Sequence, residues 1–351
     1  MLKFPKQFRD DLEKAIKIYN DIEETHRGLG KLALFEVLSD IANRCLLVVG
    51  SSGTGKSVIS NAVYEKVKRS KLMLDAITVS GLRRIENVLN YNTVTVVVDD
   101  LSKGQTEYSQ MATVSVFSAL CYTHRIRKFT GQMQLSIEGF SGSAIINLQP
   151  LLLRKIAKLP EFETDIRDKV IRYYHLRFPR QENIEKPKIT VEWDYLDDFN
   201  LPIEDNARKS AYYNYAFTNF RFEFSKARAR EHLTAYLNAS ARLNDRAKIT
   251  KADCWLIYQL SRNFLIEPNI MIKESLEGER YIDENVLPLL SALATWKTPK
   301  IRDLMFRFGV RKSTLYSIIA DNTDICVLIK NRGIIAPTPE TLELLKMIGE
   351  W

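Results

Sequence analysis

The sequence predicts an α/β fold whose centre is a parallel sheet with helices on both faces. Of its 351 residues, 45% are hydrophobic and 27% are charged, which is ordinary usage for a globular protein and excludes collagen-like, mucin-like and wholly disordered chains. Short, continuous apolar runs alternate with longer segments of helical periodicity, and strands buried on both faces of a parallel sheet produce such runs. The length is typical of about two domains.

Five apolar runs are expected to form the strands of this sheet. They lie at 45–49, 71–79, 93–98, 143–146 and 170–178. Helix-like segments separate them at 56–69, 82–90, 109–123 and 150–158, and two more helices are expected at 6–26 and 29–43. Because strands and helices alternate along the chain, we expect a doubly wound arrangement.

Composition and periodicity divide the chain further. Residues 179–206 lose periodicity and gain proline and charge, which indicates a linker. Helical patterns resume between 207 and 265, and a second break at 266–283 precedes the last segment. We therefore expect an N-terminal helix (1–28), an α/β core with its linker (29–206), a helical region (207–265) and a C-terminal module (285–351).

The strongest functional pattern follows the first strand. Residues 50–57 read GSSGTGKS and fit G-x-x-x-x-G-K-[ST] between an apolar strand and a helix, which is the context that a phosphate-binding P-loop needs. Backbone N–H groups and the positive end of the helix dipole would hold phosphate oxygens. Lys56 would reach the β- and γ-phosphates, and the Ser57 hydroxyl would ligate Mg²⁺. The expected nucleotide-binding residues are Gly50, Ser51, Ser52, Gly53, Thr54, Gly55, Lys56 and Ser57.

Two acids follow the third strand directly. The apolar run 94–98 leads into Asp99 and Asp100, which is the Walker B pattern that accompanies a P-loop. Asp99 is expected to hold Mg²⁺ through its water shell. Asp100 is expected to orient or deprotonate the attacking water. Glutamate is common at the second place of the Walker B pattern, and the shorter side chain of Asp100 reaches less far.

Together these motifs resemble the AAA+ ATPases. In that family a strand after the acidic pair ends in a polar residue, called sensor 1, which touches the γ-phosphate or the attacking water. Residues 143–147 read SAIIN, so the resemblance implies that Asn147 is sensor 1, with Gln149 as the alternative. The implied ligands are ATP and Mg²⁺.

The resemblance extends into the helical region. AAA+ proteins carry an all-helical lid, and residues 224–265 are similar to the lids of origin-recognition initiators and of minichromosome maintenance helicases. In those helicases a sensor 2 arginine stands thirteen places before an Ala-Arg pair, here Ala241 and Arg242. The resemblance therefore implies Arg228 as sensor 2, with Arg230 as the alternative.

The family also uses an arginine finger that acts on a neighbouring subunit, so the resemblance implies a homo-oligomer, as a ring or a filament. Arg167 is the first candidate for this finger, followed by Arg172 and Lys169. Residues 125–142 are expected to form a hairpin insertion, and in helicase-like groups such a hairpin touches DNA. Its basic residues are Arg125, Arg127 and Lys128.

The C-terminal module shows a second recognisable pattern. A helix ends at Gly309, a second helix starts near Ser313, and a hairpin signal at 331–333 is followed by a last helix that opens at Pro339. This order resembles a winged helix-turn-helix, in which the second helix enters the major groove and the hairpin tip contacts the backbone. The implied DNA contacts are Arg311, Lys312, Ser313, Thr314, Tyr316, Lys330 and Arg332, and we expect residues 285–351 to bind duplex DNA on their own.

Charge and cysteine usage complete the functional expectation. The formal net charge is +8 and the pI about 9.1, which favours a polyanionic partner. The N-terminus has no apolar signal-peptide region, no run of 18 apolar residues would span a membrane, and the four separated cysteines favour a reducing, cytoplasmic location.

We therefore expect an ATPase of the initiator or helicase type, acting on double-stranded DNA. The alternative is an ATP-gated DNA-binding regulator of transposition or transcription with slow turnover. A small-molecule kinase ranks last, because it would leave the C-terminal module unexplained.

Overall fold

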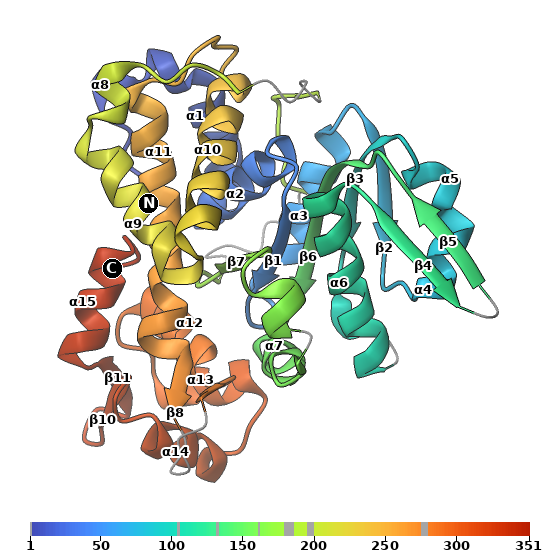
Figure 1. The fold of residues 1–351 in the computed structure, drawn as a ribbon. Coiled ribbons are helices and arrows are strands. Elements are labelled where there is room, and N and C mark those ends of the chain that lie inside the picture. The colour runs from blue at the N-terminus through green and yellow to red at the C-terminus, as the bar shows by residue number, and fades with distance from the viewer. Residues whose placement is uncertain are drawn as a thin grey trace.

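The centre of the molecule is a five-stranded parallel sheet with the strand order β2-β3-β6-β1-β7. The computed structural model describes residues 2–103, 106–130, 133–160, 162–178, 186–194, 200–274 and 280–351. The strands are β1 (Cys45–Val49), β2 (Ser70–Leu74), β3 (Thr93–Val98), β6 (Ser141–Leu148) and β7 (Ile171–Tyr174) (Figure 1). All five predicted strands are present, and the expected α/β class with a parallel sheet is confirmed.

Two strands are shorter than predicted for local reasons. β2 ends at Leu74, and Thr78 then caps a new helical turn because its side chain accepts a hydrogen bond from the Gly81 amide. That turn, α4 (Val79–Leu82), continues into η3 (Arg83–Ile85) and α5 (Glu86–Leu89), so the single helix predicted at 82–90 is broken. β7 ends at Tyr174, although the His175 amide still donates to the Val49 carbonyl.

Helices cover both faces of the sheet. α2 (Gly30–Ile41) and α3 (Lys56–Lys66) lie on one face, and α6 (Glu107–Thr123) and α7 (Pro150–Ala157) lie on the other. Side chains of β1 alternate between two hydrophobic clusters: Leu46 and Val48 face the first pair of helices, and Leu47 and Val49 face the second. This alternation fixes the register in which the end of β1 presents the loop that follows it.

A helical bundle extends the α2 face. α8 (Asp205–Arg208), α9 (Ala211–Glu223), α10 (Lys226–Leu243) and α11 (Lys251–Ser261), followed by the turn η6 (Arg262–Leu265), pack with α2 and with α1 (Glu13–Thr25) (Figure 1). Two single turns, η1 (Lys6–Phe8) and η2 (Asp10–Leu12), precede α1. The predicted N-terminal helix at 6–26 is therefore two turns and a shorter helix.

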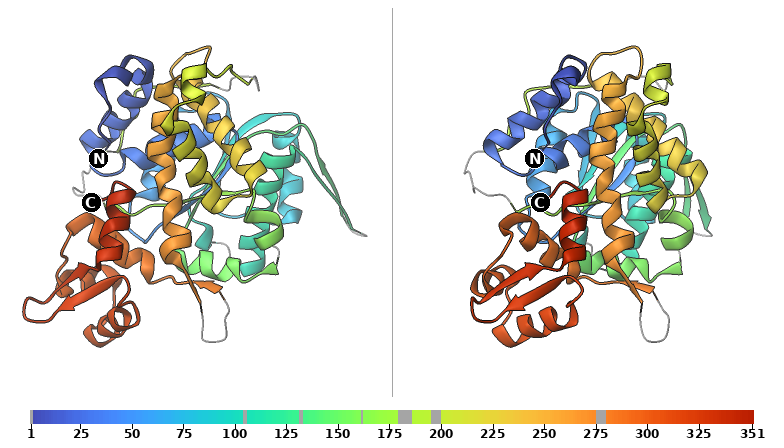
Figure 2. Two further views of the ribbon diagram at one scale, coloured as in Figure 1. Left: turned by 60° about the vertical axis from the view of Figure 1, so that its left-hand side comes forward. Right: turned by 90° about the vertical axis from the view of Figure 1, so that its left-hand side faces the viewer.

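The C-terminal module shares the hydrophobic cluster of the other sheet face. It consists of α12 (Val286–Trp296), α13 (Ile301–Phe308), α14 (Lys312–Asp321), the antiparallel hairpin β10 (Cys326–Ile329) and β11 (Ile334–Pro337), and α15 (Pro339–Met347) (Figure 2). Leu290, Leu304 and Leu345 of the module belong to the same cluster as Val96 of the sheet. The module therefore packs on the core.

The remaining described elements are short. The predicted insertion contains the hairpin β4 (Ile126–Thr130) and β5 (Met133–Ile137), which projects from the side of the molecule (Figure 1). Others are η4 (Leu101–Lys103), η5 (Phe162–Ile166), η7 (Glu267–Met271), β8 (Ile272–Glu274) and β9 (Arg280–Ile282). Among the helices that the structure describes, none has the length and apolar character that crossing a membrane requires.

Candidate functional site

The loop between β1 and α3 has the backbone geometry of a phosphate cradle. Gly55 has φ +82°, a left-handed conformation that favours glycine, and a Cβ on it would lie 2.7 Å from the Leu29 side chain. Gly53 has φ +71°. α3 begins at Lys56, so its free N–H groups and the positive end of its dipole point into the loop.

The Lys56 side chain is folded into this loop. Its Nζ donates to the carbonyl oxygens of Gly50 at 2.6 Å and Ser51 at 2.9 Å. The residue is 8% exposed, and burial lowers the pKa of Lys56 to about 8, although the nearby carboxylate of Asp100 acts in the opposite direction. An anion in the cradle would favour the charged form of Lys56.

His175 supports the loop from the end of β7, a role that no sequence pattern indicates. Its buried ring donates a hydrogen bond from Nε2 to the Thr54 carbonyl oxygen at 3.0 Å. Burial, together with the charge of Lys56, lowers the pKa of His175 to about 4, so the ring is neutral at neutral pH. In the sequence, His175 lies within the strand predicted at 170–178, and nothing there indicates a contact with the loop.

The two acids lie next to the loop, where β3 ends. The Ser57 hydroxyl donates to the backbone oxygen of Asp99 at 3.2 Å, and Asp99 Oδ2 accepts from Lys103 at 3.2 Å. Asp99 Oδ1 is buried and has no hydrogen-bond partner in the described part of the chain. Asp100 accepts from the Ser102 amide at 2.9 Å and from its hydroxyl at 2.7 Å. A hydroxyl and a carboxylate with a free buried oxygen fit Mg²⁺, which prefers oxygen ligands.

Asn147 joins these residues because β6 lies between β1 and β3. Its Nδ2 donates to the Ser60 hydroxyl at 2.9 Å, and its buried Oδ1 has no partner among the described residues. The loop, both acids, Asn147 and Gln149 line one cavity of about 210 Å³. The structure therefore brings together the residues predicted from three separate strand ends.

A buried glutamate stands behind Asn147. Ser60 donates to Glu36 Oε1 at 3.0 Å, and Glu36 is fully buried on α2. Burial raises the pKa of Glu36 well above its usual range, against the weaker effect of the Ser60 hydrogen bond. The Glu36 carboxyl group thus fixes Ser60 and, through it, the Asn147 amide. The only sign of Glu36 in the sequence is that it is an acidic residue within the largely apolar helix predicted at 29–43.

Arg228 is not brought to the phosphate loop of its own chain. It lies at the start of α10, with its guanidinium 4.0 Å from the centre of the Tyr122 ring and 2.8 Å from Glu231. Tyr122 is near the end of α6, at the edge of the sheet where the strands begin, whereas the loop lies where they end. The packing of α10 on α2 fixes this placement, so the Arg228 side chain does not reach the phosphate loop of its own chain. The alternative, Arg230, lines a cavity at the same distant edge.

None of the described residues that line the loop cavity belongs to the helices between 205 and 265. These helices therefore do not cover the loop as a lid would. The C-terminal module approaches the loop instead, because the Arg307 guanidinium lies 3.7 Å from the point that a Cβ on Gly53 would occupy.

The three candidates for the arginine finger differ in burial. The Arg167 side chain is 43% exposed and pairs with Glu163 at 2.8 Å. Arg172 is buried and pairs with Glu267 at 2.7 Å and Glu223 at 3.8 Å, so it cannot reach a neighbouring subunit. Lys169 is half-buried.

The predicted DNA contacts are on the surface of the C-terminal module. Arg311, Lys312, Ser313 and Thr314 are exposed at the start of α14, and Tyr316 is half-buried, with Lys312 5.6 Å from its ring centre. Lys330 and Arg332 lie at the tip of the β10–β11 hairpin, and Arg332 is exposed there.

On the other hairpin, β4–β5, Arg125 is exposed and Arg127 pairs with Glu138. The Lys128 side chain is outside the described part of the structure.

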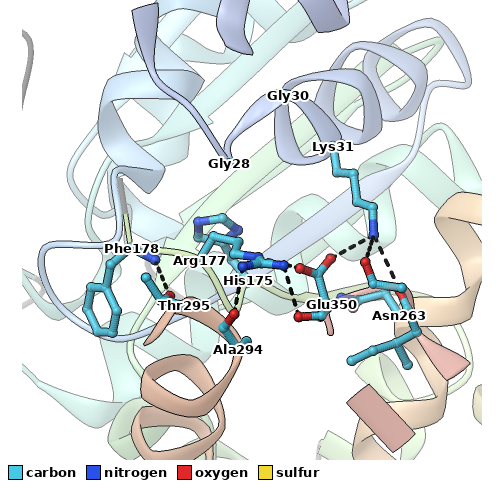
Figure 3. Close-up of polar contacts among 12 residues, drawn as sticks. Gly28, Gly30, Lys31, His175, Arg177, Phe178, Asn263, Ala294, Thr295 and Glu350 are labelled. Atoms are coloured by element: carbon cyan, nitrogen blue, oxygen red, sulfur yellow. Dashed lines mark hydrogen bonds and ion pairs between the residues drawn. The ribbon is translucent and has the colours of Figure 1, made fainter. Parts of the chain in front are cut away.

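The C-terminal end of the chain is clamped beside the loop. Figure 3 shows Glu350 between Lys31 and Arg177: Oε1 accepts from Lys31 Nζ at 2.7 Å, and Oε2 accepts from Arg177 Nε at 2.5 Å. Burial alone would raise the pKa of Glu350, but Lys31 and Arg177 lower it to about 2. These residues line a second cavity, of about 200 Å³, which extends to Gly28 and Phe178.

The low pKa of Lys56 predicts proton uptake when a polyphosphate binds. In the free protein Lys56 loses its proton above about pH 8, and phosphate oxygens beside it would restore the charged form. Nucleotide affinity should therefore fall as the pH rises above 8, by up to about tenfold per pH unit. Calorimetric titration about one pH unit above this pKa, in buffers of different ionisation enthalpy, measures the uptake. Equal binding heats in all buffers would contradict the prediction.

Comparison of the chain with known protein families found no family model that matches it, and comparison with curated proteins found no match either.

Proposed function

We propose that the chain is a Mg²⁺-dependent ATPase of the AAA+ class that acts on double-stranded DNA. The observation that carries this proposal is the convergence of the phosphate loop, the acidic pair and Asn147 in one cavity at one edge of the sheet. Nucleotide hydrolysis needs a phosphate cradle, a metal ligand and a group that orients water, and these three sets of residues supply the matching chemistry.

Different residues of the cavity would bind the phosphates, bind Mg²⁺ and orient the attacking water. Loop N–H groups and Lys56 would hold the β- and γ-phosphates, and Ser57 and Asp99 would hold Mg²⁺. Bound Mg²⁺ would neutralise charge that develops on the phosphates. Asp100 would orient or deprotonate water, and Asn147 would turn its amide toward the γ-phosphate or that water, which requires it to leave Ser60.

A homo-oligomer is the second part of the proposal. Arg167 is exposed and lies just before β7, at the edge of the sheet away from the phosphate loop of its own chain. An arginine in that place can act only on the site of another copy. The position and exposure of Arg167 therefore support the finger role better than those of Arg172.

The DNA-binding part of the proposal rests on the C-terminal module. The order of α13, α14, the hairpin β10–β11 and α15 is compatible with a winged helix-turn-helix, and basic residues gather at the start of α14 and at the hairpin tip. Helix starts of this kind contact base edges, and basic tips contact phosphates.

Arg332→Ala should weaken binding of the full-length protein to any duplex. Without this phosphate contact, binding releases fewer counterions from the DNA. The slope of log affinity against log salt concentration should therefore become shallower by about 1. Fluorescence anisotropy with labelled duplexes of two sequences, titrated from about 50 to 200 mM salt, measures both effects. Arg311→Ala is the matched variant at the start of α14, where a changed sequence preference is expected. An unchanged salt slope for Arg332→Ala would exclude the hairpin tip from the DNA contact.

The test of the whole proposal is Mg²⁺-dependent phosphate release from ATP, measured with and without duplex DNA. Strong stimulation by DNA, together with strand displacement, would identify a motor. The alternative function, an ATP-gated DNA-binding regulator, predicts tight ATP-dependent DNA binding with negligible turnover. It is favoured by the packing of the C-terminal module beside the phosphate loop, since a switch needs such proximity.

A further inference from the structure

Arg307 lies beside the phosphate loop although it belongs to the C-terminal module. Its Nη1 is 3.7 Å from the position of a Cβ on Gly53, the loop residue with φ +71°. α13 carries Arg307 one residue before its end, and the following helix, α14, starts at Lys312. One short helix pair therefore connects the phosphate loop with the surface proposed to contact DNA.

Two aromatic rings hold this guanidinium in place. Arg307 lies 4.9 Å from the ring centre of Phe178 and 5.7 Å from that of Trp296, and the two rings stack on each other at 5.3 Å. Phe178 is tied to α12 because its amide donates to the Thr295 hydroxyl at 3.2 Å. Arginine keeps its charge when it stacks, so the rings position a cation without neutralising it.

The surroundings of Arg307 favour an anion. The start of α3 and Lys56 already make the loop electropositive, and a further cation beside them is repelled unless a negative group lies between them. Within the described residues, no carboxylate is paired with Arg307, whose exposed side chain lies over the two rings and beside Gly53. A triphosphate in the cradle would supply that negative charge, and the planar guanidinium suits phosphate oxygens.

The clamp around Glu350 keeps the module in this position. Arg177, which binds Glu350, also donates to the Ala294 carbonyl at 2.6 Å (Figure 3). Lys31 donates to the carbonyls of Ile348 and Gly349. These contacts join both ends of the module to α2 and to the segment after β7, on the side where Arg307 lies.

We propose that Arg307 contacts the phosphates of the bound nucleotide and thereby couples the nucleotide site to the surface of α14. The proposal rests on the proposed nucleotide-binding function and adds a residue from outside the α/β core to its site. Coupling between two sites is reciprocal, so DNA bound at α14 changes nucleotide affinity by the same factor as nucleotide changes DNA affinity.

The test is equilibrium titration of the full-length protein with a fluorescent triphosphate nucleotide and with the diphosphate. Arg307→Ala should weaken triphosphate binding about tenfold to a hundredfold, the range for a hydrogen bond between charged groups. Arg302→Ala is the matched control: it lies on the same helix, its side chain is 89% exposed, and its guanidinium lies 3.9 Å from the carboxylate of the neighbouring Asp303. It should bind like the wild type. Arg307→Gln is the second variant, in case Arg307→Ala does not fold.

A second measurement separates coupling from simple binding. In the wild type, a non-hydrolysable triphosphate should slow hydrogen exchange of the α13 and α14 amides, and this protection should be absent in Arg307→Gln. The inference would be overturned if Arg307→Gln had the same triphosphate affinity and the same amide protection as Arg302→Ala. In that case, loss of nucleotide binding in Lys56→Ala would still support the proposed function. If the wild-type protein binds neither nucleotide, the proposed function itself fails.

Discussion

Lys56→Ala should lose ATP hydrolysis, by about a hundredfold or more, and should also bind ATP more weakly. The Nζ of Lys56 donates to the loop carbonyls of Gly50 and Ser51, so it lies within the loop that is proposed to hold the β- and γ-phosphates. Removing one such preorganised donor typically lowers the rate by about 10² to 10³. Phosphate release and equilibrium nucleotide binding measure the two effects separately.

Asp100→Asn is the paired variant, and it should separate binding from turnover. The substitution keeps the size of the side chain, but an amide cannot take a proton, so nucleotide affinity should persist while hydrolysis falls by about 10² to 10⁴. The hydrogen bonds from Ser102 should survive the change, since an amide oxygen still accepts them, and the segment should therefore stay intact. Hydrolysis by Asp100→Asn at the wild-type rate would show that the acidic pair has been assigned the wrong roles.

Arg172→Met should destabilise the protein strongly, whereas Arg167→Ala should lower only its activity. Arg172 is the buried cation that compensates Glu223 and Glu267, and without it two carboxyl groups remain in a site from which water is excluded. Breaking such a cluster typically costs about 3–5 kcal/mol of the free energy of unfolding. Thermal and denaturant unfolding measure this loss.

The pKa values within this cluster show how the charge is shared. Burial alone would lower the pKa of Arg172, but Glu267 and Glu223 raise it, so the guanidinium stays charged. Burial also raises the pKa of Glu223, whereas Arg172 outweighs burial at Glu267 and lowers its pKa. Glu267 is therefore the ionised partner, and Glu267→Gln should also destabilise the fold.

Arg167→Ala provides the contrast, because its side chain is exposed and exposed substitutions change stability by about 0.5 kcal/mol or less. An arginine finger contributes about 10³ to 10⁵ to the rate of phosphoryl transfer. ATPase activity should therefore fall without loss of ATP affinity. Mixing Arg167→Ala with Lys56→Ala should restore some activity, since each supplies what the other lacks. Full activity of Arg167→Ala as a monomer would exclude the finger role.

The sequence was most informative where backbone geometry and residue type are tightly linked. The GSSGTGKS loop, the apolar strand leading into Asp99 and the strand ending in Asn147 each follow local rules, so their convergence was predictable once the strands were parallel. Boundaries were less predictable: β2 stops before Asp75, inside the run predicted as one strand, and no periodicity marks that point.

Contacts between distant segments could not be predicted in the same way. Arg228 was placed by a spacing within its own helix, but the packing of α10 on α2 decides which edge of the sheet it reaches. His175 and Arg307 approach the loop through tertiary packing, from the ends of a strand and of a helix far along the chain. Neither residue stands in a pattern that would distinguish it from its neighbours.

The continuous hydrophobic cluster between the sheet and the C-terminal module has a consequence for how the protein can be divided. Leu289, Leu290 and Leu293 of α12 are fully buried in a cluster that also contains Val96 and Ile146 of the sheet. A fragment of residues 285–351 would expose this apolar surface to water, which favours aggregation over the independent DNA binding expected from the sequence. The two parts should therefore melt in a single cooperative transition.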